Sequence, residues 1–140
     1  MTYKYWELEI DGPDKTGKDL LCKYLCEFSH YRFSINVRGL ISQLVYAKKF
    51  KRDFEYNTRD FSKNKILIVL LGEPADLAVR CKTTGEPPYD IENDLALFKL
   101  VTYEVEEKGY IVLKYNTSSA TPYAIARDIL RVIEQLEEED

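Results

Sequence analysis

The sequence predicts an α/β fold, an open, doubly wound parallel sheet with helices on both faces, within a single domain of 140 residues. Three observations predict this fold. Strand-like and helix-like segments alternate along the chain. Residues 66–71 form an uninterrupted apolar run, typical of a parallel strand covered on both faces. A loop with glycine at both ends, residues 12–18, lies between the first strand and the first helix, where such sheets bind ligands.

Four segments are expected to be strands. The first alternates apolar and charged residues from Trp6 to Ile10, and the third contains the apolar run. The other two are short segments rich in β-branched and aromatic residues. The expected strands are residues 5–10, 33–37, 65–71 and 110–115.

Helices are expected between and after these strands. Pro74 and Pro122 suit the first turn of a helix, where a missing N–H costs nothing. In the segment 91–108, apolar residues such as Leu95 and Phe98 follow the helical period. The expected helices are residues 17–31, 40 to about 52, 74–81, 91–108 and 122–138, with a further short piece near 53–61.

Composition indicates a soluble globular protein, 45% apolar and 31% charged, with net charge −4. No apolar run approaches 18 residues and no signal peptide is evident, so we expect a cytoplasmic protein without a membrane partner. Three cysteines and one histidine without metal-binding spacing exclude a zinc site and a His-based triad. Net acidity disfavours nucleic acid as a partner, and the basic run 48–52 is interpreted as a solvated helix face.

The loop after the first strand carries the chemistry. Its sequence, Gly12-Pro13-Asp14-Lys15-Thr16-Gly17-Lys18, has the GxxxxGK spacing of a phosphate-binding loop. The glycines allow consecutive N–H groups and the helix N-terminus to face an anion. Lys18 would reach the β- and γ-phosphates of a nucleoside triphosphate. Asp19 replaces the usual Ser or Thr, and its carboxylate is a suitable ligand for Mg²⁺.

Several segments, in order, resemble the thymidylate kinases. Ile10 to Lys18 looks like the opening of that family, and Val37-Arg38 to Tyr46 is similar to its Asp-Arg-x-x-x-Ser-x-x-x-Tyr segment. Residues 70–80 resemble the strand that leads into the lid helix and its arginine. Residues 111–122 resemble the last strand and the nucleotide-base loop before the terminal helix. There are two departures. A strand and helix before Val37 are missing, and Val37 replaces the family's Asp.

The resemblance implies a short, divergent member of the P-loop deoxynucleoside monophosphate kinases, which use ATP and Mg²⁺. Lys18 would then hold the donor phosphates. Arg38 would hold the acceptor phosphate or make a surface ion pair. Arg80 would act in a lid, stacking on adenine or clamping the phosphoryl group, or else lie in an exposed loop. Asp14 would face the reaction centre or only form a turn, and Asn116 would lie against the base.

The residues leave the acceptor and the activity open between alternatives. A nucleoside monophosphate is already an anionic nucleophile, so it needs no general base, and the lack of Asp at Val37 favours it over a nucleoside. Aromatic residues that could stack on its base are Tyr31, Phe33, Tyr46 and Tyr56. The alternatives are a catalytically impaired nucleotide-binding module, and a kinase acting on a modified base or hydroxyl in DNA. A homodimer could complete the truncated acceptor site.

Overall fold

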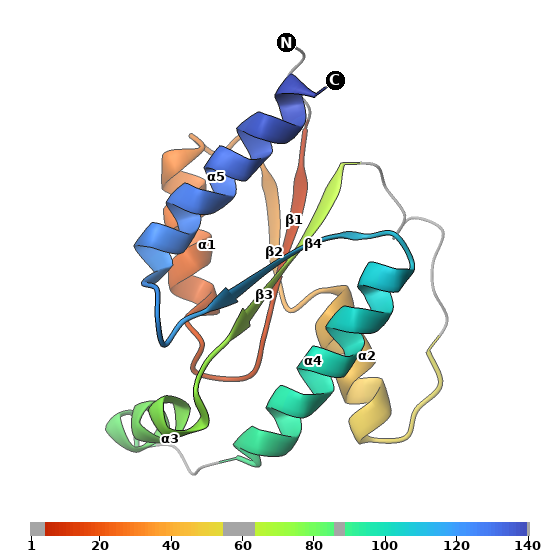
Figure 1. Ribbon diagram of the computed structural model, residues 1–140. Helices are drawn as coiled ribbons and strands as arrows, with labels where there is room; N and C mark the ends of the chain where they lie inside the picture. The colour runs from red at the N-terminus through yellow and green to blue at the C-terminus, as the bar shows by residue number, and fades with distance from the viewer. Residues whose placement is uncertain (1–4, 55–63, 86–88, 140) are drawn as a thin grey trace.

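A four-stranded parallel sheet with helices on both faces forms the centre of the computed structural model, which describes residues 5–54, 64–85 and 89–139 (Figure 1). The strand order is β2-β1-β3-β4, and every pairing between neighbours is parallel. The predicted α/β class and parallel sheet are therefore confirmed. The strands are β1 (Glu7–Asp11), β2 (Ser34–Val37), β3 (Lys65–Leu71) and β4 (Ile111–Asn116).

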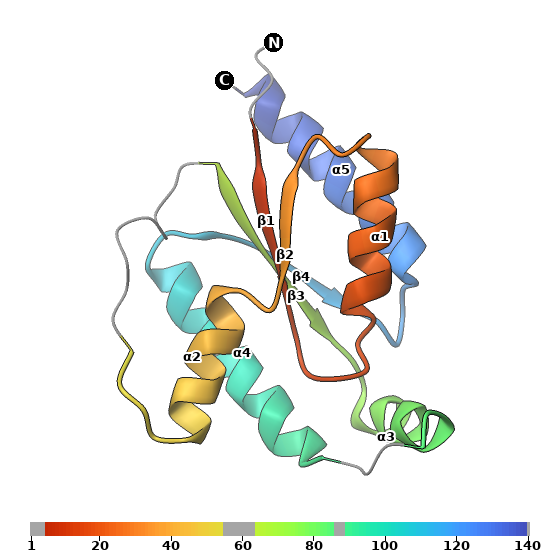
Figure 2. The ribbon, with the colours of Figure 1, turned by 180° about the vertical axis from the view of Figure 1, so that it is seen from behind.

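The helices form one layer on each side of the sheet. Helices α1 (Lys18–Phe28) and α5 (Pro122–Glu138) cover one face, and α2 (Leu40–Lys49) and α4 (Ile91–Glu107) cover the other (Figures 1 and 2). Helix α3 (Pro74–Thr83) lies beyond the carboxyl end of β3. None of the described helices is both long and apolar enough to cross a membrane.

The chain changes direction across the sheet next to β1. It passes from β1 to its neighbour β2 at one edge, and then returns past β1 to β3 on the other side. The helices that follow β1 and β2 consequently lie on opposite faces (Figure 2). In open α/β sheets, ligands bind beyond the carboxyl ends of the strands at such a switch point. The loop 12–18 follows β1 at this place.

The two hydrophobic cores explain the apolar run in β3. Ile66, Ile68 and Leu70 pack into the core beneath α1 and α5, whereas Leu67 and Val69 pack into the core beneath α2 and α4. All five are fully buried. Since successive side chains of a strand point to opposite faces, a strand covered on both sides must be apolar throughout.

The predicted element boundaries agree with the structure to within a few residues. Strand β1 begins at Glu7 rather than Tyr5, and α2 ends at Lys49 rather than near Arg52. Helix α1 ends at Phe28, three residues earlier than predicted. Of the piece expected near 53–61, residues 53 and 54 are not helical and the rest lie outside the described residues.

The basic run is paired within the fold. Lys48 Nζ lies 3.1 Å from Glu104 Oε1, and Lys49 Nζ lies 2.9 Å from Asp94 Oδ1, so both lysines join α2 to α4. The hydrogen bond to Asp94 raises the pKa of Lys49. These pairs place Lys48 and Lys49 on the face of α2 that meets α4, whereas the absence of a nucleic-acid partner stays a prediction.

Candidate functional site

The loop 12–18 joins β1 to α1 and requires glycine at both of its ends. A Cβ at Gly12 would lie 2.2 Å from the carbonyl oxygen of Leu70, so only glycine fits beside β3. Gly17 has φ 88 and is the N-cap of α1 in the left-handed region, which glycine adopts without steric cost. The sequence prediction that glycines let this loop wrap closely agrees with both positions.

Side chains bind every carbonyl oxygen from Gly12 to Lys15. The bonds are Lys18 Nζ to Gly12 O (2.8 Å) and Pro13 O (2.9 Å), Thr16 Oγ1 to Pro13 O (2.8 Å), Tyr89 Oη to Asp14 O (2.7 Å) and Arg80 Nη1 to Lys15 O (2.8 Å). In a trans peptide the N–H points opposite to the C=O. The N–H groups of Asp14, Lys15 and Thr16 therefore each point away from the side chain that binds the carbonyl oxygen of the same peptide, and they follow one another as a row along the loop.

The N-terminus of α1 continues this row. Within the part of the chain that the structure describes, no group accepts a hydrogen bond from the N–H of Lys18, Asp19 or Leu20. The first pairing is from Leu21 N to Gly17 O, at 3.0 Å. Unpaired N–H groups and the positive end of the helix dipole favour an anion at this position.

Lys18 is the buried cation of the site. Its side chain is folded under the loop and the residue is only 6% exposed. Burial lowers the pKa of Lys18 to about 8, and the Arg38 guanidinium adds to this effect, while the Asp14 carboxylate opposes it. Lys18 is thus a cation that gains stability when a negative charge arrives.

A hollow of about 350 Å³ beside the loop brings the predicted site residues together. Besides Lys18 it is lined by the charged residues Asp14, Lys15, Asp19 and Arg38. Arg38 lies directly after β2, as predicted, and its Nη2 is 3.7 Å from Asp14 Oδ1. Both side chains are more than half exposed, so this ion pair is weak and available to a ligand.

The donor set of this hollow fits Mg²⁺. Mg²⁺ is commonly bound through one or two carboxylates together with phosphate oxygens. Asp14 and Asp19 both line the hollow and both are exposed, which supplies the two carboxylates. The expected metal ligand Asp19 therefore lines the same hollow as Asp14, and its role as a metal ligand stays a prediction.

The guanidinium of Arg80 is held by hydrogen bonds to two other segments of the chain. Arg80 lies in the last turn of α3, where its guanidinium donates to Lys15 O, to Thr117 Oγ1 (3.1 Å) and to Thr117 O (3.0 Å). These bonds tie the loop 12–18 to the segment after β4. Asn116 stabilises that segment, because its amide donates to Glu73 Oε1 (3.2 Å) and its Oδ1 accepts from Ser118 N (2.8 Å).

Sequence reasoning gave no role to Tyr89, which binds the loop, or to Asp11, which binds the start of α2. Tyr89 precedes α4 and binds the loop only because the chain returns there in three dimensions. Burial raises the pKa of Tyr89, so its hydroxyl remains a donor at neutral pH. Asp11 ends β1, is fully buried and accepts from Gly39 N at 2.7 Å. Its acidic character at a strand end was the only sequence signal for either residue.

The three aromatic candidates for base stacking that the structure describes are not among the residues that line this hollow. Phe33 is buried in the core beneath α1 and α5, and Tyr31 follows the C-terminal end of α1, away from the loop. Tyr46 stacks on Phe50 along α2, with ring centroids 6.3 Å apart. Tyr56 lies outside the described residues.

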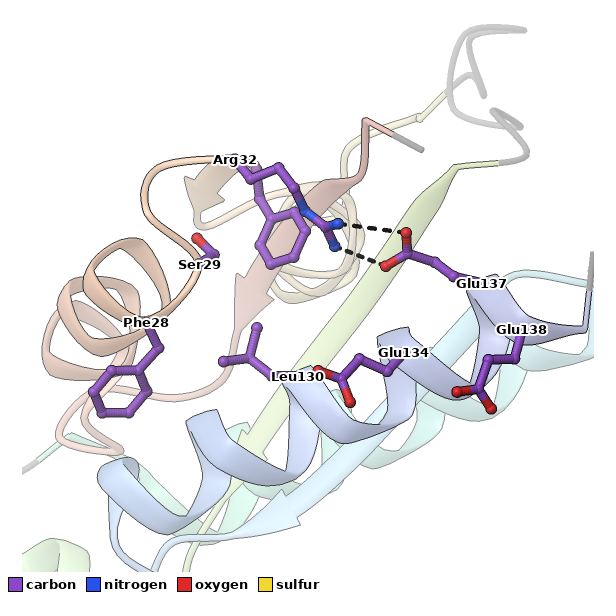
Figure 3. A pocket seen from close by; sticks show the side chains of 8 residues that line it. Phe28, Ser29, Arg32, Leu130, Glu134, Glu137 and Glu138 are labelled. Atoms are coloured by element: carbon purple, nitrogen blue, oxygen red, sulfur yellow. Dashed lines mark hydrogen bonds and ion pairs between the residues drawn. The ribbon is translucent and has the colours of Figure 1, made fainter. Parts of the chain in front are cut away.

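A second cavity, of about 370 Å³, lies where α1 and α5 end, at the opposite end of the sheet (Figure 3). Arg32 makes a two-pronged ion pair with Glu137 there, with N–O distances of 2.7 and 3.4 Å. Glu137 is 2% exposed, whereas the Arg32 side chain is 32% exposed. Of the residues predicted for the site, only the stacking candidate Phe33 is among those that line this cavity. The ion pair joins the chain before β2 to the end of α5.

Comparisons with known proteins establish the fold. No protein-family model and no curated protein sequence matches the chain. Among solved structures it is similar to the YorR protein of Bacillus subtilis, crystallised in complex with phosphorylated GDP. The two share 21% sequence identity with a TM-score of 0.75, and the match covers 96% of this chain and 98% of YorR.

Proposed function

We propose that this protein is a nucleotide kinase that transfers the γ-phosphoryl group of ATP to a deoxynucleoside monophosphate, with a thymidylate-like acceptor. One observation carries the proposal. Side chains bind the carbonyl oxygens of the loop 12–15, so the N–H groups of the same peptides point away from those side chains. Next to them lie the first N–H groups of α1, for which no described group is an acceptor, and the buried Lys18. The similarity in fold to a protein crystallised with a phosphorylated nucleotide supports it.

The charges of the hollow suit a nucleoside triphosphate bound with a divalent cation. Lys15, Lys18 and Arg38 contribute three positive charges, and Asp14 and Asp19 contribute two negative charges. Asp14 and Asp19 would hold Mg²⁺, which would supply neutralisation of the charge on the transferred phosphoryl group. Lys18 would leave the carbonyls of Gly12 and Pro13 and bind the β- and γ-phosphates.

In the reaction, an oxygen of the acceptor phosphate forms a bond to the γ-phosphorus of ATP. The bond from that phosphorus to the oxygen that bridges it to the β-phosphorus breaks, so that ADP and a deoxynucleoside diphosphate are formed. The acceptor phosphate is ionised at neutral pH and has no proton to remove. The planar guanidinium of Arg38 would bind the acceptor phosphate through two parallel hydrogen bonds. Its weak ion pair with Asp14 would break, because the phosphate carries the stronger negative charge.

A nucleotide-binding module without catalysis is the second candidate. The observation that favours it is the position of Arg80, whose three hydrogen bonds to Lys15 and Thr117 keep its guanidinium away from the hollow. In addition, β2 ends in Val37, which offers no carboxylate to the reaction centre. Such a protein would bind ATP with the same loop and would turn over slowly or not at all.

Turnover separates the two candidates. ADP release from Mg-ATP is measured with a panel of deoxynucleoside and ribonucleoside monophosphates, and without acceptor. We expect release that depends on a deoxynucleoside monophosphate and is abolished in Lys18→Ala. Lys23→Ala, which removes an exposed lysine from the same helix, serves as the matched control and should retain full activity. Tight ATP binding without turnover on any acceptor would establish the binding module instead.

A further inference from the structure

Two buried carboxylates on the central strand have no role in the function proposed above. Glu9 is 8% exposed and Asp11 is 0% exposed. They are two residues apart on β1, so their side chains point to the same face of the sheet. A buried carboxylate is costly unless it is paired and hydrogen-bonded, so its partners indicate what it is for.

Both carboxylates bind the first turn of α2. Glu9 Oε1 accepts from Leu40 N (2.7 Å), and Asp11 Oδ1 accepts from Gly39 N (2.7 Å), from Ser42 N (3.1 Å) and from the Ser42 hydroxyl. The N-cap of α2 is Gly39, which has no side chain to bind these N–H groups. Carboxylates from β1 therefore replace the usual N-cap side chain.

The approach of α2 to β1 is as close as glycine permits. A Cβ at Gly39 would lie 2.2 Å from Glu9 Oε1 and 2.7 Å from Glu9 Cβ. Glu9 is also fixed from its other side, since Lys65 Nζ on β3 lies 2.8 Å from Glu9 Oε2. The start of α2 is thus held in one position relative to the sheet.

Arg38 lies between these anchors in a left-handed conformation. Its φ is 68, which is unfavourable for a residue with a Cβ. The N–H of Arg38 donates to Ile10 O (2.8 Å), and the next N–H, of Gly39, donates to Asp11. Both peptides that flank Arg38 are therefore tied to β1. Its guanidinium then lies 3.7 Å from Asp14 at the hollow.

We propose that Asp11, supported by Glu9, is a positioning residue that holds Arg38 in this left-handed conformation and so directs its guanidinium to the phosphate-binding loop. Backbone outliers persist where the surroundings fix them, and they are concentrated at functional sites. An arginine with helical or extended backbone here would point its side chain elsewhere. The identification of the anion at Arg38 as a nucleotide phosphate rests on the proposed function.

The first test concerns the backbone and needs no activity. Arg38→Gly and Arg38→Ala both remove the guanidinium, but only glycine accepts φ 68 without steric cost. The glycine variant should unfold roughly 2–4 °C above the alanine variant. An alanine variant as stable as the glycine variant would overturn the proposal, because the backbone would then not be held in the left-handed region.

The second test is a double-mutant cycle on the kinetics of the acceptor. Asp11→Ala should lower kcat/KM for the acceptor about tenfold in the wild-type background, but less than about twofold in the Arg38→Ala background. Asp11→Asn keeps an accepting oxygen and should restore most of the loss. Equal losses in both backgrounds would show that Asp11 acts on the loop directly, which contradicts the proposal.

Asp94→Ala provides the matched control for this cycle. Asp94 is also a buried carboxylate that contacts α2, but it does so through Lys49 at the other end of the helix. Asp94→Ala should lower the free energy of unfolding. Its effect on kcat/KM for the acceptor should be the same in the wild-type and Arg38→Ala backgrounds. Coupling of Asp94 to Arg38 as strong as that of Asp11 would mean that any loosening of α2 suffices, and would refute a specific role.

A test of anion binding separates failure of the positioning role from failure of the proposed kinase function. If wild-type protein turns over no acceptor, the cycle is repeated on the affinity for inorganic pyrophosphate, which needs only an anion site at the loop. Asp11→Ala and Arg38→Ala should then weaken pyrophosphate binding without adding to each other. Additive losses, or no pyrophosphate binding to the wild-type protein, would overturn the positioning role as well.

Discussion

The buried lysine of the loop should make the proposed nucleotide binding dependent on pH. In the free protein, burial lowers the pKa of Lys18 from 10.5 to about 8. A bound phosphate would place negative charge next to the ammonium and would return its pKa toward the ordinary value. Nucleotide binding should therefore be accompanied by uptake of a proton around pH 8 by Lys18.

The size of the effect follows from the two pKa values. With a free pKa of about 8 and a bound pKa above 10, proton uptake should be about 0.1 per nucleotide at pH 7, 0.5 at pH 8 and 0.9 at pH 9. The same linkage makes affinity about tenfold weaker at pH 9 than at pH 7. At pH 8 and above the phosphates of ADP contribute little, because their last ionisation lies near pH 6, whereas at pH 7 their proton release is about as large as the uptake by Lys18.

Isothermal titration of ADP into the metal-free protein measures this uptake, in EDTA and in two buffers of different ionisation enthalpy. Lys18→Met keeps the apolar part of the side chain and should show weak binding without proton uptake at pH 8. Uptake close to zero in the wild-type protein, or equal uptake in the variant, would refute the reasoning. The first result would mean that Lys18 is already fully charged, and the second that another group takes up the proton.

Three further changes test other parts of the structure. Gly12→Ala would place a Cβ 2.2 Å from Leu70 O, so calorimetry should show at least about tenfold weaker nucleotide binding, with about 1–3 kcal/mol lower stability. Arg80→Ala unties the loop and should weaken nucleotide binding about tenfold; unchanged affinity would assign Arg80 a purely structural role. Glu137→Gln breaks the partly exposed pair with Arg32 and should cost about 1–2 kcal/mol in urea denaturation while nucleotide affinity stays unchanged, and a change in affinity would contradict the separation of the two ends.

Local patterns account for what the sequence predicted correctly. The apolar run of β3 reflects two cores that meet at one strand, and such a run is visible without knowing what covers it. The GxxxxGK spacing is likewise local, because the same few residues turn the chain and present its N–H groups. The candidate residues Lys18, Asp14, Asp19 and Arg38 converge because parallel strands end at the same edge of the sheet.

Contacts between distant segments account for what sequence reasoning missed. Tyr89 binds Asp14 O across 75 positions of sequence, and no spacing rule connects them. The resemblance to thymidylate kinases predicted a lid role for Arg80, which stays a prediction, but it did not predict the hydrogen bonds of Arg80 to Thr117, because these depend on how α3 meets the segment after β4. The early end of α1 has a local cause instead, since His30 and Tyr31 adopt the positive φ values 54 and 59, with which a helix cannot continue.

The starts of the helices show why the anion is expected at α1 and not elsewhere along this edge of the sheet. All four helices packed on the sheet begin at the carboxyl ends of the strands (Figure 1). Asp90 caps α4 by accepting from Asn93 N, and Thr121 caps α5 by accepting from Ala124 N.

The first turn of α2 is bound by the carboxylates of β1, as described above. Of these four helices, only α1 has a first turn that no described side chain caps, and Lys18 lies buried at that same turn. An uncapped turn beside a buried cation is unfavourable in the free protein. A bound phosphate would relieve both costs at once, by accepting hydrogen bonds from the free N–H groups and by neutralising Lys18. The arrangement is therefore understandable as one adapted to the bound state rather than to the stability of the empty protein.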